Sequence, residues 1–117
     1  MEETAEARAR VRHVRIAPRK VRIVVNLVRG KNLRDAEAIL RHTPKRASKV
    51  VSKLIQSAAA NAENNHDLDR RDLFVAEIWV DGGPILKRIH PRSRGQAFSI
   101  FKRTSHISVV LRPRHGG

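Results

Sequence analysis

Apolar residues recur at every third or fourth position in three stretches of the chain, a spacing that is typical of helices with one buried face. The first stretch begins at Pro18, because proline fits the first position of a helix, and ends before Gly30, a residue that commonly stops one. We therefore predict a helix between these two residues. Its apolar stripe consists of Val21, Val24, Val25 and Val28, widened by Ile23 and Leu27.

Two more helices are predicted downstream. The second runs from about Leu33 to His42, with Asn32 as its N-cap. The third runs from Pro44 to about Asn64, because Thr43 can cap it and proline suits its first position. The second helix buries Leu33, Ala36, Ile39 and Leu40. The third, which has the clearest period, buries Ala47, Val50, Val51, Leu54, Ile55, Ala58 and Ala62.

Three segments have the alternation of strands. They are residues 8–16, residues 73–81 and residues 97–112. In the second, one apolar face is formed by Phe74, Ala76, Ile78 and Val80.

Residues 82–96 separate the last two strands and show no helical period. Glycine and proline break the pattern, and the simplest solution is a β-hairpin that extends beyond the body, with its tip near residues 91–95. At ~3.3 Å per residue, arms of about ten residues would reach roughly 30 Å. A charged two-stranded ribbon of this kind is marginally stable by itself, so we expect it to be ordered by a polyanionic partner.

The charge of the chain points to such a partner. The 117 residues suit one domain, and 25 Lys and Arg against 11 Asp and Glu give a net charge of +14. Residues 7–34 and 82–117 contain no acidic residue but hold 18 of the basic ones. A solvated surface normally mixes the two signs, so this segregation predicts contact with phosphates. Arginine outnumbers lysine by 18 to 7, which favours bidentate phosphate contact.

Other classes of function find little support. The chain has no cysteine and no apolar run near the ~18 residues that span a bilayer, and its acidic beginning is unlike a secretory or transit signal. We therefore expect a cytosolic protein without a membrane partner. His66, Asp67 and Asp69 are better explained as a solvated loop than as metal ligands, and no catalytic set or phosphate-binding loop is present. No enzyme activity, metal or cofactor is expected.

Several motifs resemble one family. The chain resembles the L-twenty-two family of bacterial large-subunit (50S) ribosomal proteins over about residues 11–111. The motifs that carry the resemblance are PRK at 18–20, RGK at 29–31, TPK at 43–45, GP at 83–84, PR and G within 91–95, and KRTSHI at 102–107. Ala17 departs from the family, in which serine is common, and so removes a helix cap.

The resemblance implies an α+β fold with three helices packed on a small three-stranded antiparallel sheet, plus the extended hairpin. From the length and the residues themselves we expect a single domain over residues 1–117, with the arm at 82–103 and a flexible tail at 113–117. The resemblance also implies a structural protein that binds large-subunit (23S) ribosomal RNA and aids assembly. The globular part would lie near the polypeptide exit as a monomer within the cytoplasmic ribosome, beside neighbouring ribosomal proteins.

The arm would line the exit tunnel and meet the nascent polypeptide. Its tunnel-lining tip would comprise Leu86, Lys87, Arg88, Ile89, His90, Pro91, Arg92, Ser93, Arg94 and Gly95. Together, the charge pattern and the resemblance predict RNA contacts at Arg12, Arg15, Arg19, Lys20, Arg22, Arg29, Lys31, Lys45, Arg46, Lys49, Lys87, Arg88, His90, Arg92, Arg94, Lys102, Arg103, Thr104 and His106. With aromatic residues at only 3%, we expect recognition through RNA shape and backbone, without an aromatic stacking platform.

Two alternatives stay open on composition alone. A basic DNA-architectural protein could lay the β-arm in a groove with Pro91 as a wedge. A peripheral membrane protein would need a helix with an apolar face opposite a basic face. The third helix has part of this character, but its stripe is needed for the core.

Overall fold

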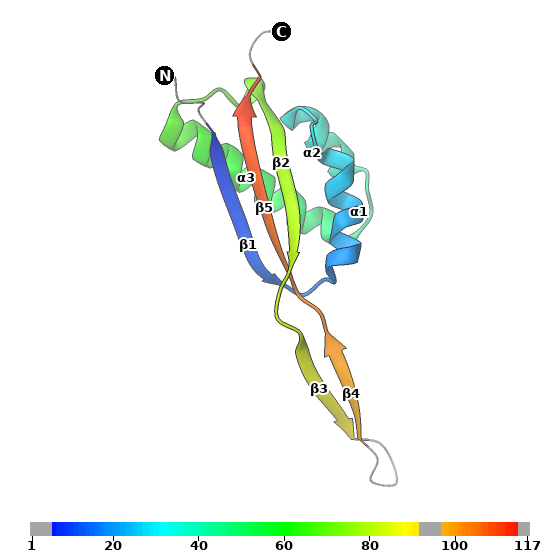
Figure 1. The fold of residues 1–117 in the computed structure, drawn as a ribbon. Coiled ribbons are helices and arrows are strands. Elements are labelled where there is room, and N and C mark those ends of the chain that lie inside the picture. The colour runs from blue at the N-terminus through cyan, green and yellow to red at the C-terminus, as the bar shows by residue number, and fades with distance from the viewer. Residues whose placement is uncertain (1–5, 92–96, 115–117) are drawn as a thin grey trace.

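The protein is an α+β structure with an extended arm (Figure 1). The computed structural model describes residues 6–91 and 97–114. Three helices pack on a three-stranded antiparallel sheet of order β1-β5-β2, and a separate two-stranded ribbon, β3-β4, continues from it. This confirms the predicted fold class. The elements are β1 (Ala7–Val14), α1 (Pro18–Val28), α2 (Leu33–Arg41), α3 (Arg46–His66), the 3-10 helix η1 (Arg70–Asp72), β2 (Leu73–Gly82), β3 (Leu86–Pro91), β4 (Ala97–Lys102) and β5 (Ser105–Pro113).

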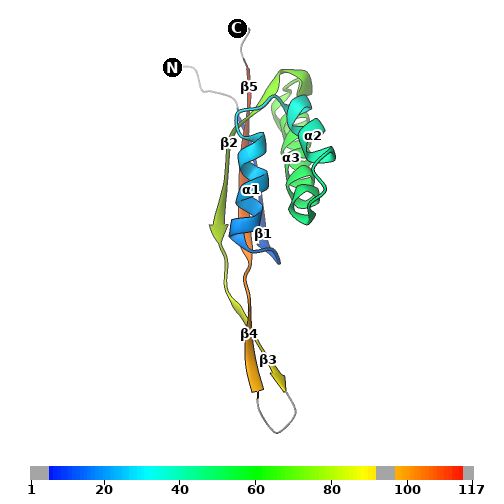
Figure 2. The same cartoon turned by 90° about the vertical axis from the view of Figure 1, so that its right-hand side faces the viewer.

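The helices cover only one face of the sheet (Figure 2). Helix α3 packs against β1 and β5, α1 packs against β2, and α2 lies against both other helices. Aliphatic side chains from the three helices and the inner sheet face form the core, with Ile55, Val51, Ile107 and Leu111 fully buried. The opposite face of the sheet has no helix over it among the described residues.

Helix α1 begins and ends where the sequence predicts. Pro18 occupies its first turn, and Gly30 follows it with a φ of +79°, a left-handed conformation that favours glycine. Its four predicted valines are buried. The prediction that Ile23 and Leu27 widen the stripe is wrong, because these side chains are 52% and 42% exposed. They lie on the opposite side of the helix, since the valines already fill its contact with the sheet and the other helices.

Asn32 occupies the N-cap position of α2, as predicted, but its side chain makes no capping bond. The predicted start of α3 is wrong, because this helix begins at Arg46, two residues after Pro44. The Thr43 hydroxyl donates instead to the Ile39 carbonyl (2.6 Å), so it closes the end of α2 rather than opening α3. The predicted stripe of α3 is buried apart from Val50, which is half-buried.

Strand β2 contains a bulge, and before the bulge the buried side of the strand is the opposite of the one predicted. The pairing with β5 shifts register between Val75 and Glu77, so residues before the shift point the other way. Leu73 and Val75 are therefore buried beside Ile78 and Val80, whereas the predicted Phe74 and Ala76 are only half-buried.

The predicted hairpin is confirmed along its described length. Strands β3 and β4 pair from Leu86–Lys102 to Pro91–Ala97, while residues 92–96, where its tip was predicted, lie outside the described part. The predicted strand 97–112 is in fact two strands, interrupted at residues 103–104. The molecule measures 67 × 31 × 20 Å, and its radius of gyration of 17.7 Å exceeds the ~13 Å of a compact chain of this length. That the whole chain forms one domain stays a prediction.

A set of local hydrogen bonds joins the arm to the body, and we call it the arm root. Pro84 has no N–H to donate, so the ladder stops there. The hydroxyl of Thr104 donates to the Pro84 carbonyl (2.6 Å) instead, and the Gly83 N–H donates to the Thr104 carbonyl (2.9 Å). The hydroxyl of Ser105 donates to the carbonyl of Ile16 (2.5 Å), which ties the arm root to the segment before α1.

Substitution Gly83→Ala should loosen the arm root. A Cβ at this position would lie 2.5 Å from Thr104 Oγ1 and 3.1 Å from His106 Cε1, and buried, β-branched Thr104 cannot move without losing its bond to Pro84. We expect a loss of about 1–3 kcal/mol in the free energy of unfolding, measured by urea denaturation. The matched control is Gly82→Ala, whose Cβ would meet only Pro18 Cγ at 4.0 Å. Equal stability of the two variants would contradict the steric argument.

Candidate nucleic-acid interface

Helices α1 and α3 begin beside each other, at the end of the body that carries the arm (Figures 1 and 2). The space between them is an open groove, which we call the arm-root groove. Its cations come from four separate parts of the chain, since β1 ends just before Arg15 and β4 just before Arg103. The groove is lined by Arg15, Ile16, Ala17, Lys20, Ile23, Lys45, Arg46, Ala47 and Arg103.

Both helices present uncapped N-termini to this groove. The N-cap positions are Ala17 for α1 and Lys45 for α3, and neither makes a side-chain capping bond or has an acidic residue in its first turn. A helix N-terminus carries a partial positive charge, so cations such as Lys20 and Arg46 are electrostatically unfavourable there. Free backbone N–H groups and cations that converge in this way favour an anion, and a phosphate group is the natural ligand.

A second groove runs between α2 and α3 and shares Lys45 and Arg46 with the first. We call it the α2–α3 groove. The hydroxyl of Ser48 is buried in its wall without a hydrogen-bond partner among the described residues. Sequence reasoning left Arg41, Ser48 and Lys53 out of the site, although Lys53 lies one helical turn after Lys49. The groove is lined by Glu37, Leu40, Arg41, Thr43, Pro44, Lys45, Arg46, Ser48, Lys49, Ser52, Lys53 and Gln56.

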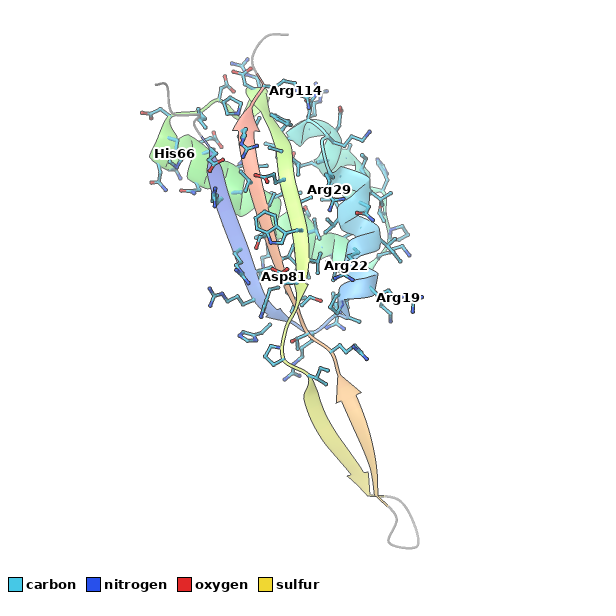
Figure 3. The ribbon with its side chains drawn as sticks, viewed as in Figure 1. Arg19, Arg22, Arg29, His66, Asp81 and Arg114 are labelled. Carbon is cyan, nitrogen blue, oxygen red and sulfur yellow. The ribbon has the colours of Figure 1, made fainter. Side chains whose placement is uncertain are left out.

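The cations predicted on α1 divide into two groups (Figure 3). Arg19 and Arg22 are exposed along the helix. Arg29 is used within the fold, because its guanidinium donates to the Ile78 carbonyl (2.8 Å) and to Asn26 Oδ1 (2.7 Å). It therefore satisfies an acceptor on the free edge of β2, and its contact with RNA stays a prediction.

Ion pairing separates the predicted site from the rest of the surface. Among the described residues, all ion pairs involve Arg8, Arg10, Arg70, Arg71 or Arg112, and none of these belongs to the predicted RNA-binding set. The members of that set whose side chains are described, and which pair with no described acid, are Arg12, Arg15, Arg19, Lys20, Arg22, Arg29, Lys31, Lys45, Arg46, Lys49 and Arg103. Apart from Arg29, whose guanidinium bonds Ile78 and Asn26, these cations remain available to an external anion.

The end of the body away from the arm has a mixed charge instead. Arg70 pairs with Glu63 (2.9 Å) and Arg71 with Asp69 (2.8 Å). Hydrogen bonds from the Arg71 side chain and backbone lower the pKa of Asp69 to about 2. Likewise, hydrogen bonds from Arg8 and then Arg112 lower the pKa of Glu6. These cations already have partners, so we do not assign them to the interface.

Thr104 and His106 have a structural role that the sequence did not reveal. Thr104 is 3% exposed, and its hydroxyl is held by Pro84. The Nδ1 atom of His106 accepts the backbone N–H of His13 (3.1 Å), which has a φ of +58° in the β1 bulge. Both side chains therefore help to hold the arm root, and their predicted RNA contacts are untested.

The predicted arm residues are located only in part. Leu86, Lys87, Arg88, Ile89, His90 and Pro91 lie on β3, and Lys102 ends β4. Arg92, Ser93, Arg94 and Gly95 lie outside the described residues. Within the described part of the chain, no group of three or more His, Asp or Glu side chains could hold a metal ion. Nor does any described helix have the length and apolarity to cross a membrane.

Comparison with known proteins identifies the family. A family model described as "Ribosomal protein L22p/L17e" matches residues 9–112. The chain belongs to this family. The L22p/L17e match contains both grooves and the arm, so the elements that build the candidate interface are those of the family.

Individual relatives agree with this assignment over almost their whole length. Three proteins named "Large ribosomal subunit protein uL22" illustrate it. That of Thermus thermophilus is 57% identical over 111 residues, covering 95% of this chain and 98% of the relative. That of Clostridium novyi (strain NT) is 55% identical over 109 residues, covering 93% and 98%. That of Pelotomaculum thermopropionicum (strain DSM 13744 / JCM 10971 / SI) is 57% identical over 112 residues, covering 96% and 99%.

Neutralising the residues shared by both grooves should weaken RNA binding. For Lys45→Gln with Arg46→Gln, we expect affinity for large-subunit ribosomal RNA to fall on the order of tenfold, and the slope of log affinity against log salt to flatten by about 1–2. Filter retention across a salt series measures both quantities. The matched control is Arg70→Gln with Arg71→Gln, two ion-paired arginines at the far end. Equal losses of affinity in the two variants would show that RNA binding depends on the net charge of the protein and not on the position of these residues.

Proposed function

We propose that this chain is a structural component of the large ribosomal subunit that binds large-subunit ribosomal RNA and aids its assembly. The observation that carries the proposal is a set of cations around two uncapped helix N-termini at the arm root, where they pair with no described acid. Phosphates of more than one RNA segment could reach these cations at once, because the two grooves open beside each other. Family membership and the names of the relatives support the same assignment.

We also propose a division of labour between body and arm. The body would sit at the outer surface of the subunit near the polypeptide exit, as a single domain, and contact neighbouring ribosomal proteins there. The arm, residues 82–103, would run inward and line the exit tunnel, where its tip meets the nascent polypeptide. A long, narrow molecule of 67 × 31 × 20 Å is suited to this, because a ribbon can enter where a globular domain cannot.

The remaining possibilities have weaker support. A membrane role would need the apolar face of α3, but Val51, Leu54 and Ile55 of that face are buried against the rest of the body. Family membership favours RNA over DNA as the polyanion. We propose a non-enzymatic protein of the cytoplasmic ribosome, present there as a monomer and requiring no cofactor.

Crosslinking in cell lysate tests the assignment directly. RNA attached to residues 86–96 is recovered and sequenced. We expect crosslinks concentrated in large-subunit ribosomal RNA, because the arm would be enclosed by it. Crosslinks distributed over DNA or unrelated RNAs would overturn the proposed placement of the arm.

Reversing the charge of the arm should weaken docking without unfolding the body. The variant combines Lys87→Glu, Arg88→Glu, Arg92→Glu and Arg94→Glu. RNA retention should fall strongly, because attraction to phosphate becomes repulsion. The circular dichroism spectrum should keep its helical signal, since all three helices belong to the body. The corresponding glutamine variant is the control that separates lost attraction from added repulsion, and loss of helix in either variant would contradict the division into body and arm.

A further inference from the structure

The open face of the sheet contains a row of three residues that the grooves do not include. Pairing places Arg10 of β1 and Trp79 of β2 opposite Ser108 of β5, one on each side. The neighbouring residues of β5, Ile107 and Val109, belong to the core, so the row lies on the face away from the helices. Two strand spacings separate its ends by about 10 Å.

Trp79 is unusually exposed for an indole. Its side chain is 39% exposed, and it is the only tryptophan of the chain. The ring of Phe74, on the same strand, differs because the Arg114 guanidinium covers it at 4.5 Å. An exposed aromatic ring on the surface of a sheet can stack on an unpaired base.

Ser108 supplies an independent observation. It is 5% exposed, and its hydroxyl has no hydrogen-bond partner among the described residues. Ser105, three residues earlier on the same strand, differs in that its hydroxyl donates to the Ile16 carbonyl. Buried hydroxyls normally have partners, so an external group is expected to provide the missing one. Ser108 lines a shallow hollow with Arg8, Ala9, Arg10, Trp79, Val109 and Val110.

The charges beside the hollow leave Arg10 free to turn outward. The carboxylate of Glu77 is held by Arg112 at 2.8 Å, and that of Glu6 by Arg8 at 2.7 Å. Arg10 is 44% exposed and meets Asp81, at the arm end of β2 (Figure 3), only at 4.0 Å. A contact of that length does not hold the guanidinium, which can therefore reach a phosphate.

We propose that this face binds one unpaired nucleotide of the RNA. The indole of Trp79 stacks on the base, the hydroxyl of Ser108 bonds a polar atom of the base or ribose, and Arg10 contacts the phosphate. The inference rests on the proposed function and adds to it a site for an unstacked base. A protein surface is the other possible occupant. It would not need an exposed indole, an unsatisfied hydroxyl and an arginine in one row, whereas a base, a ribose and a phosphate would use all three.

The chain itself provides the probe. It has one tryptophan and no tyrosine, so intrinsic fluorescence reports on Trp79 alone. The full chain is titrated with deproteinised large-subunit ribosomal RNA, and binding is followed in parallel by filter retention. We expect the emission to be quenched over the concentration range in which RNA is retained. Retention of RNA with unchanged emission would overturn the stacking site while leaving the proposed function intact, whereas no retention at all would overturn the proposed function.

Variants then test whether the contact contributes to binding. Trp79→Ala should weaken affinity roughly tenfold, and Trp79→Phe should restore most of it, because a phenyl ring still stacks. Ser108→Ala should cost several-fold, as expected for one hydrogen bond. Phe74→Leu is the matched control, since its ring is already covered, and should leave affinity unchanged. Quenching by RNA together with full affinity of Trp79→Ala would also refute the site, as would quenching by ribosomal proteins in place of RNA.

Discussion

Strand β5 is hydrogen-bonded along both of its edges, by β1 on one side and β2 on the other, and the remaining structure depends on this double pairing. Strands β2 and β5 continue into the arm, so the register that buries Ile78 and Ile107 also sets the direction in which the arm leaves the body. Because Ser105 at the start of β5 bonds Ile16, two residues before α1 begins, the arm and the uncapped N-terminus of α1 are held together. The position of the arm-root groove is therefore a consequence of core packing.

The two ends of the body differ in how far their charges are paired within the fold. Away from the arm, arginines such as Arg70 and Arg71 pair with nearby carboxylates, and the fold satisfies its own charges. In the arm-root groove, helix dipoles and cations repel one another, and none of the groove's cations pairs with a described acid. In the isolated chain this electrostatic repulsion is unfavourable at the surface where the ligand would bind, and phosphate binding would relieve it.

Local rules predicted the elements well and failed where tertiary contacts compete. The helix from Pro18 and the hairpin followed from proline, glycine and hydrophobic period alone. The buried face of β2 was not predicted correctly, because a bulge after Val75 shifts the alternation of buried and exposed residues. An alternating pattern in the sequence does not reveal where such a bulge lies. Thr43 was predicted to cap α3, but its hydroxyl bonds back to Ile39, since the preceding helix offers an unpaired carbonyl.

The candidate site was predictable as a set of residues but not as a geometry. The charge pattern and the resemblance together identified Arg15, Lys45 and Arg103, yet only the fold brings them to one groove. A low aromatic content does not say where a single indole lies, and it is the strand pairing that sets Trp79 opposite Ser108. Ser105 and Ser108 make the same point on a single strand: one closes the arm root, and the other faces the open side beside Trp79. The two serines differ because the pairing register places their side chains in different surroundings. What matters for the proposed site is therefore this register, which exposes an indole beside an unsatisfied hydroxyl, and not the number of aromatic residues.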